Sequence, residues 1–137
     1  MRTQTFTYRG TLPGMNEILS AQATVYHAGK KRQSGYTGLK AQCTADVAWS
    51  AIAAGIRKVE HYPVRIGVVI YAKNRRSDPH NLAAGAEKMI LDGLKEAKIL
   101  RNDGWSELVG EDDTTGPAPR FVVDATNPRV EVVLEEP

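Results

Sequence analysis

Residues 75–81 bring an acid, an imidazole and an amide together, in the order Arg-Arg-Ser-Asp-Pro-His-Asn. Hydrolysis of a phosphodiester requires a metal ion that activates water and neutralises charge on the phosphate, and Mg²⁺ uses a few carboxylates while keeping several waters. Asp78 and His80 are candidate ligands in this segment, and Asp103 is a second acid further along the chain. These residue types predict a metal centre formed by Asp78, His80 and Asp103.

A helix is predicted between the two acids. Asp78-Pro79 is typical of a helix start, because Asp accepts hydrogen bonds from free N–H groups and Pro loses no needed donor there. Apolar residues then recur at helical spacing and predict a helix that runs to about residue 97. The apolar stripe consists of Leu82, Ala86, Met89, Ile90, Leu94 and Ala97.

The same helix carries a second, more polar stripe. Asn81, Gly85, Lys88 and Asp92 are separated by four, three and four residues, so they fall on one narrow line along a helix, away from the apolar one. One interpretation is a solvated face with a weak Lys88–Asp92 pair. The other is a polar face that extends from the metal centre, in which Lys88 supports the phosphate or the leaving group.

Each candidate also has a purely structural interpretation. Asp78 is explained as a helix cap, and His80 as an exposed residue of the first turn. Asp103 precedes Gly104, and Asp-Gly is a common pair in turns. Taken singly, none of these residues establishes catalysis.

The remaining pattern predicts one α+β domain over residues 1–137, in which a small mixed sheet packs with two main helices. The first of these helices begins at Leu39 and ends near Gly55. A loop is expected at 110–119, and Asn127-Pro128 is expected to form the turn between the last two strands. The predicted strands are residues 3–10, 64–72, 105–109, 120–124 and 129–134.

The composition is that of an ordinary globular protein, with 42% hydrophobic and 25% charged residues. Cys43 is the only cysteine, which excludes an intramolecular disulfide framework and favours a reducing compartment. The sequence has no signal-peptide pattern and no apolar run near the roughly 18 residues that span a bilayer. We therefore expect a cytoplasmic protein that does not insert into a membrane.

The charge is unevenly distributed and favours a polyanionic partner. Residues 1–76 hold 12 Lys and Arg against 3 Asp and Glu, whereas residues 77–137 hold 6 against 13. Residues 29–38 are rich in glycine and cations, which predicts a basic loop. No phosphate-loop pattern is present, so no nucleotide cofactor is expected. The candidate DNA-binding residues are Lys30, Lys31, Arg32, Tyr36, Lys40, Lys73, Arg75, Arg76 and Asn81.

The segment from Arg75 to Asp103 resembles the core of RusA-type Holliday junction resolvases. Members of that family carry an arginine-flanked Asp-x-Asp-Asn-Leu, then a helix, then an acidic pair. The similar segments here are residues 75–82, residues 90–94 (Ile-Leu-Asp-Gly-Leu) and Asn102-Asp103. Residues 12–17, Leu-Pro-Gly-Met-Asn-Glu, resemble the family's Pro-x-x-Asn stretch. The resemblance implies a homodimer, often of phage or prophage origin, that makes paired cuts in four-way DNA junctions with Mg²⁺ or Mn²⁺.

Carried over by position, the resemblance assigns Asp78, Asn81 and Asp103 to the family site. Lys88 matches the helix lysine one turn late, since the usual position holds Ala84. His80 stands where the family has its second aspartate, which predicts weaker Mg²⁺ binding or a bias toward Mn²⁺. His80 also keeps open an alternative, a DNA-binding protein that recognises branched DNA without cutting it.

Overall fold

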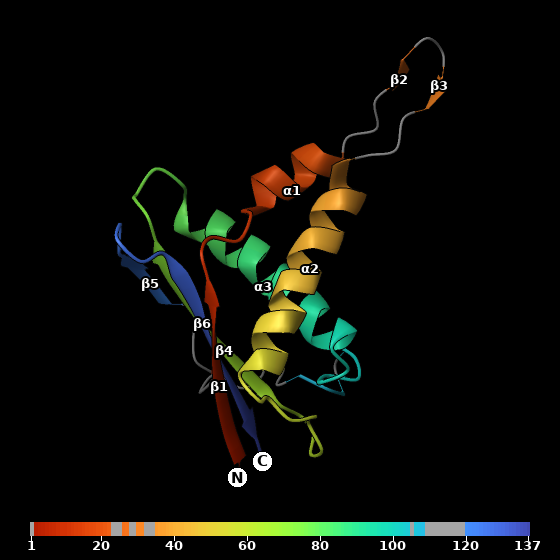
Figure 1. Ribbon diagram of the computed structural model, residues 1–137, viewed down its shortest axis with the longest axis vertical. Coiled ribbons are helices and arrows are strands. Elements are labelled where there is room, and N and C mark those ends of the chain that lie inside the picture. The colour runs from red at the N-terminus through yellow and green to blue at the C-terminus, as the bar shows by residue number, and fades with distance from the viewer. Residues whose placement is uncertain (1, 23–25, 28–29, 32–34, 105, 109–119) are drawn as a thin grey trace.

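Three helices and a four-stranded mixed sheet make up most of the chain that the structure, a computed structural model, describes: residues 2–22, 26–27, 30–31, 35–104, 106–108 and 120–137. The predicted α+β class is confirmed. The helices cover one face of the sheet (Figure 1). In chain order the elements are β1 (Arg2–Arg9), α1 (Met15–Gln22), β2 (Tyr26–His27), β3 (Lys30–Lys31), α2 (Gly35–Ala53), β4 (Arg65–Ala72), α3 (Pro79–Glu96), β5 (Arg120–Val123) and β6 (Arg129–Glu136).

The sheet has the strand order β1-β6-β4-β5, in which β5 runs parallel to β4 and the other neighbours are antiparallel. Residues 124–128 do connect β5 to β6, but these strands are not neighbours, because β4 lies between them. The connection crosses the end of β4, where Asp124 N–H donates to the Ala72 carbonyl over 2.8 Å. Alternating Val130, Val132 and Leu134 of β6 are buried in the core, as the period of two predicts.

Helix α3 matches its prediction closely. Asp78 is its N-cap and Pro79 its first residue, and Ala97 is its C-cap. The apolar stripe is buried at Met89, Ile90 and Leu94, each with an exposed fraction of 0%. The helix therefore stands in the middle of the structure, in contact with α1, α2 and the sheet.

The structure differs from the sequence-based expectation in three places. Helix α1, the first of the chain, has no counterpart among the predicted elements. Residues 29–38 are not simply a loop, because residues 30–31 pair with 26–27 in a two-stranded sheet and α2 begins at Gly35. Of the strand predicted at 105–109, the structure describes only a single parallel bridge between Val64 and Leu108; Trp105, Val109 and the predicted loop at 110–119 lie outside the described residues.

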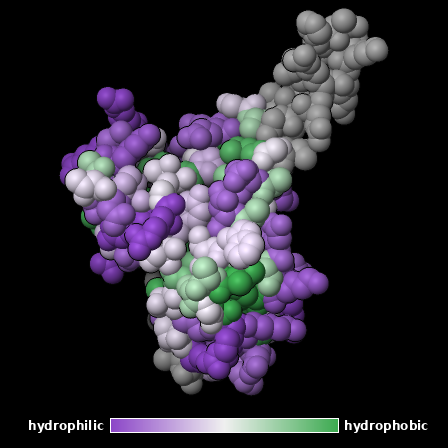
Figure 2. All heavy atoms as spheres, viewed as in Figure 1, coloured by the Kyte–Doolittle hydropathy of each residue, from purple (hydrophilic) through white to green (hydrophobic). Residues whose placement is uncertain are grey.

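The outer face of α2 leaves large apolar side chains in solvent. Trp49 and Ile52 are 69% and 54% exposed. Figure 2 shows hydrophobic residues gathered over the second half of this helix, on a face that is otherwise mostly hydrophilic. A patch of this kind is typical of a surface that contacts another molecule.

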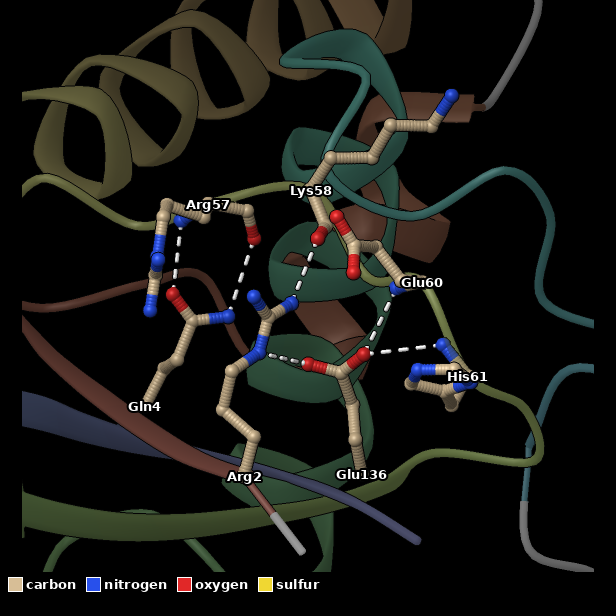
Figure 3. Close-up of polar contacts among 7 residues, drawn as sticks. All are labelled: Arg2, Gln4, Arg57, Lys58, Glu60, His61 and Glu136. Atoms are coloured by element: carbon tan, nitrogen blue, oxygen red, sulfur yellow. Dashed lines mark hydrogen bonds and ion pairs between the residues drawn. The ribbon is translucent and has the colours of Figure 1, made fainter.

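Glu136, in β6, is a buried carboxylate with an exposed fraction of 1%. It accepts hydrogen bonds from the backbone N–H groups of Glu60 (2.7 Å) and His61 (3.0 Å) and pairs with the Arg2 guanidinium (Figure 3). Burial by itself would raise the pKa of this carboxyl, but the hydrogen bonds and Arg2 outweigh it and hold the pKa below its ordinary value. The network ties β1 and β6 to the segment after α2.

Because the folded-state pKa of Glu136 is lowered, its contribution to stability is present above the ordinary pKa of 4.5 and is lost as pH falls through the lower folded value. We expect Glu136→Gln to lower the free energy of unfolding at neutral pH by about 1–3 kcal/mol, the scale of hydrogen bonds to a charged group. The difference from the unmodified protein should shrink in acid. Urea unfolding measured from neutral pH down to about pH 3 checks this; a difference that is constant with pH would contradict it.

Candidate functional site

The N-terminal end of α3 gathers the candidate residues that follow β4. Asp78 and His80 are both exposed, and the Asp78 Oδ1 atom accepts a hydrogen bond from the His80 backbone N–H over 2.9 Å. Lys73, Arg75 and Arg76, in the segment just before them, are exposed as well. This end of the helix therefore presents a carboxylate and an imidazole within a few residues of three cations.

Asn81 links this end of α3 to the segment that leads into α1. Its Oδ1 atom accepts a hydrogen bond from the backbone N–H of Asn16 over 2.7 Å, between residues 65 apart in the sequence. One turn later, Gly85 is buried against the backbone of Pro13 and Gly14. The segments 12–17 and 75–82 are thus in direct contact, and Asn81, a predicted DNA contact, uses its side-chain oxygen within the chain.

Asp103 lies at the other end of α3. Its Oδ2 atom accepts a hydrogen bond from the Lys95 ammonium over 3.2 Å, and the same ammonium lies 3.3 Å from Oδ1 of Asp92. Partial burial by itself would lower the pKa of Lys95, but Asp103 and Asp92 outweigh it and hold the pKa above its ordinary value. Lys95 therefore remains a cation that bridges the two carboxylates.

Asp92 is an enclosed acid near this end, with 11% of its side chain exposed. The Nζ atoms of Lys40 and Lys88 lie 3.9 and 3.8 Å from its Oδ2 atom, which has no hydrogen-bond partner within the described part of the chain. The predicted polar stripe is consequently not a solvated face. Gly85 faces the backbone of Pro13 and Gly14, just before α1, and its lack of a side chain allows this close contact. Asp92 faces Lys40 of α2.

The structure does not bring Asp78, His80 and Asp103 together within one chain. Helix α3 has 18 residues and is therefore about 27 Å long. Asp78 caps its first turn, whereas Asp103 contacts Lys95 in its last turn. In agreement, the described residues contain no group of three or more His, Cys, Asp or Glu side chains that could hold a metal ion. Within one chain Asp78, His80 and Asp103 do not form one group, and a metal centre formed by these three residues stays a prediction.

The predicted DNA-binding residues fall in three places. Lys73, Arg75 and Arg76 lie beside the start of α3, and Lys40 lies beside Asp92. Lys30 and Lys31 form β3, whose two-stranded sheet lies apart from the four-stranded one, beyond the ends of α1 and α2 (Figure 1). Arg32 and the side chain of Tyr36 lie outside the described residues.

A pocket of about 260 Å³, which the sequence did not predict, lies beside the first turns of α3. Its lining comes from the β1–α1 connection, α1, α2, the end of β4, the β4–α3 connection, α3 and the start of β6. Buried Cys43 is part of this lining, and burial first, then Asp46 and Glu17, raises the pKa of its thiol. No local pattern could reveal this pocket, since its walls are distant from one another in the sequence.

Comparison with family models and with curated proteins found no relative of this chain. The described helices include none that is both long and apolar enough to cross a membrane.

Proposed function

We propose that this protein is a metal-dependent endodeoxyribonuclease of the RusA type, which cuts four-way DNA junctions as a homodimer in the cytoplasm. The observation that carries the proposal is the contact between residues 12–17 and 75–82. These are two of the segments that resemble the family, and the Asn16–Asn81 hydrogen bond joins them across 65 residues. If the two likenesses were accidental, there would be no reason for segments so far apart in the sequence to contact each other.

The chemistry of the exposed end of α3 fits this function. Asp78 supplies a carboxylate for Mg²⁺ or Mn²⁺, and the His80 imidazole is a further ligand for Mn²⁺ in particular. The bound ion would activate water and neutralise charge on the phosphate. Lys73, Arg75 and Arg76 are close enough in the chain to hold the phosphates that flank the cleaved bond.

The separation of the acids supports a dimeric site. Mg²⁺ binds its oxygen ligands at about 2.1 Å, so two carboxylates that share one ion must lie within a few ångströms of each other. Asp78 and Asp103 of one chain are separated by the length of α3. A twofold-symmetric pair of chains would place Asp78 of one beside Asp103 of the other, and would do so twice, which matches the need for two symmetric cuts.

A non-catalytic protein that binds branched DNA is the second candidate. The observation in its favour is that each acid already has a structural role, Asp78 as the cap of α3 and Asp103 as the partner of Lys95. In that case the cations would bind DNA and no bond would be broken.

The two candidates are separated by incubating the protein with a synthetic four-way junction or a linear duplex, with Mg²⁺, with Mn²⁺ or with neither. We expect cuts in the junction only when metal is present. Asp78→Asn and Asp103→Asn should each reduce cutting by at least about 100-fold, because the loss of even an outer partner of a metal site costs 10–100-fold. Asparagine is an equally good N-cap, so Asp78→Asn tests the charge alone. Binding without metal-dependent cleavage would leave the second candidate standing.

His80→Asp tests the metal preference of the proposed site. An added carboxylate should strengthen Mg²⁺ binding, and we expect the ratio of the cleavage rate in Mg²⁺ to that in Mn²⁺ to rise. Rates measured over a series of metal concentrations provide the comparison. Asp78 still caps the helix in this variant, so folding should be unaffected. An unchanged ratio would show that residue 80 does not contact the metal.

A further inference from the structure

The pocket beside the first turns of α3 lies immediately next to the exposed acid and cations. Its lining includes Lys73 and Ser77, which frame the segment that contains Arg75 and Arg76 and precedes Asp78. The exposed lining residues, which mark the opening, are Thr11, Glu17, Lys73 and Ser77. DNA held by the cations of this segment would pass directly over the pocket.

The walls of the pocket suit a flat ring with polar edges. Deeper lining residues are apolar, among them Leu39, Cys43 and Ala86. Arg129 and Tyr71 also line it, and the Arg129 guanidinium lies 3.6 Å from the centre of the Tyr71 ring. The two groups already stack on each other, and Asp124 and Glu131 bind the guanidinium. A base would extend this stack, since unpaired bases stack on aromatic rings and on guanidinium planes.

The size and charge of the pocket narrow the choice of ligand. A volume of about 260 Å³ is below the 300–1,000 Å³ typical of sites for drug-sized molecules, so one ring system fits better than a whole nucleotide cofactor. The Glu17 carboxylate at the opening can accept a hydrogen bond from the amino group of a base. The neighbouring cations suit the phosphates on either side of it.

We propose that this pocket receives one nucleobase that is unstacked at the branch point of the DNA, while Lys73, Arg75 and Arg76 hold the phosphates beside it. The inference rests on the proposed function for its substrate, branched DNA. It adds a base-binding site to that function. It also explains how a small protein could distinguish a junction from a duplex, since a base beside the branch point lacks a stacking neighbour on one side and is extruded at lower cost than a base within an arm.

The test uses four-way junctions that carry the fluorescent base 2-aminopurine either at a branch-point position or in the middle of an arm. The unmodified protein is added in Ca²⁺, in place of Mg²⁺ or Mn²⁺, so that binding is measured rather than cleavage. We expect emission from the branch-point probe to rise on binding, because the probe leaves the base stack. Quenching of that emission by acrylamide should be weaker than for the free nucleotide, because the pocket shields the base. No rise, or a rise with full quenching, would overturn the proposal.

Leu39→Trp fills the pocket from α2 with a larger side chain, because Leu39 is a half-buried lining residue. This variant should lose the rise in emission and bind the junction roughly tenfold or more weakly, the scale of one lost stacked base. Its affinity for linear duplex should be unchanged. Leu19→Trp, at a leucine that is 56% exposed and outside the lining, is the matched control and should behave like the unmodified protein.

Thermal unfolding shows whether the two tryptophan variants are folded. If Leu39→Trp does not fold, the 2-aminopurine emission and quenching measured with the unmodified protein still test the proposal. The outcome is also distinct from that of the cleavage assay. Cutting without a shielded probe would reject the base pocket and leave the nuclease standing. A shielded probe without metal-dependent cutting would keep the pocket and reject the nuclease.

Discussion

Asp78→Asn and Asp103→Asn chains that are each inactive alone should recover cleavage when they are co-expressed and form mixed dimers. In a mixed dimer with shared sites, one site has lost both acids and the other retains both. Random pairing makes about half of the dimers mixed, and each of these has one intact site of two. About a quarter of the normal number of sites should therefore be active, and the products should be nicked junctions rather than resolved ones. Separation of the products on denaturing gels measures both quantities.

The control for this experiment is a mixture of Asp78→Asn with the double variant Asp78→Asn/Asp103→Asn. None of its dimers contains a site with both acids, so it should remain inactive. If the first mixture also stays inactive while the unmodified protein cuts, the two acids do not share a site across a dimer. The separation of Asp78 and Asp103 along α3 would then need another explanation, such as two independent metal positions.

Gly85→Ala is expected to destabilise the fold. A Cβ atom at this position would overlap the Pro13 carbonyl oxygen and lie 2.6 Å from the carbonyl carbon of Gly14, and backbone atoms cannot turn aside as a flexible side chain can. Overpacking of this kind costs about 1–3 kcal/mol. Urea unfolding should show this loss of stability. The cleavage rate of the folded variant should also fall, because the contact between α3 and residues 12–17 is disturbed.

Gly38→Ala is the matched control, since Gly38 also lies in a helix but a Cβ there meets nothing within 4 Å. Alanine at an unstrained helical position should raise stability by about 0.5–1 kcal/mol. The two substitutions are chemically identical, so the difference between them isolates the close approach of α3 to the segment before α1. Equal stability of the two variants would mean that this segment moves aside freely.

The local elements could be predicted because their causes lie within a few residues. Asp78 caps α3 through the N–H of His80, two positions away, and the spacing of its apolar residues places Met89, Ile90 and Leu94 in the core. The alternation in β6 similarly depends only on the pleat of the strand. Predictions of this kind needed no knowledge of the rest of the chain.

The polar stripe of α3 was harder to interpret, for a physical reason. Gly85 and Asp92 are typical of solvated helix faces, yet here the missing side chain of Gly85 admits the Pro13–Gly14 backbone and Asp92 is surrounded by lysines from two helices. Helical spacing shows the Lys88–Asp92 pair, but it shows neither the Pro13–Gly14 backbone nor Lys40 of α2. The orientation of this face was therefore decided by packing rather than by pattern.

By itself the sequence determined which residues could do chemistry, where α3 begins and ends, and which apolar stripe enters the core, because these depend on neighbouring residues. Only the tertiary structure decided that Asp78 and Asp103 lie at opposite ends of that helix, that Asn81 holds the start of α1, and that seven parts of the chain line a pocket. These features depend on contacts between residues far apart in the chain, and the free energy of such contacts leaves no periodic trace in the sequence.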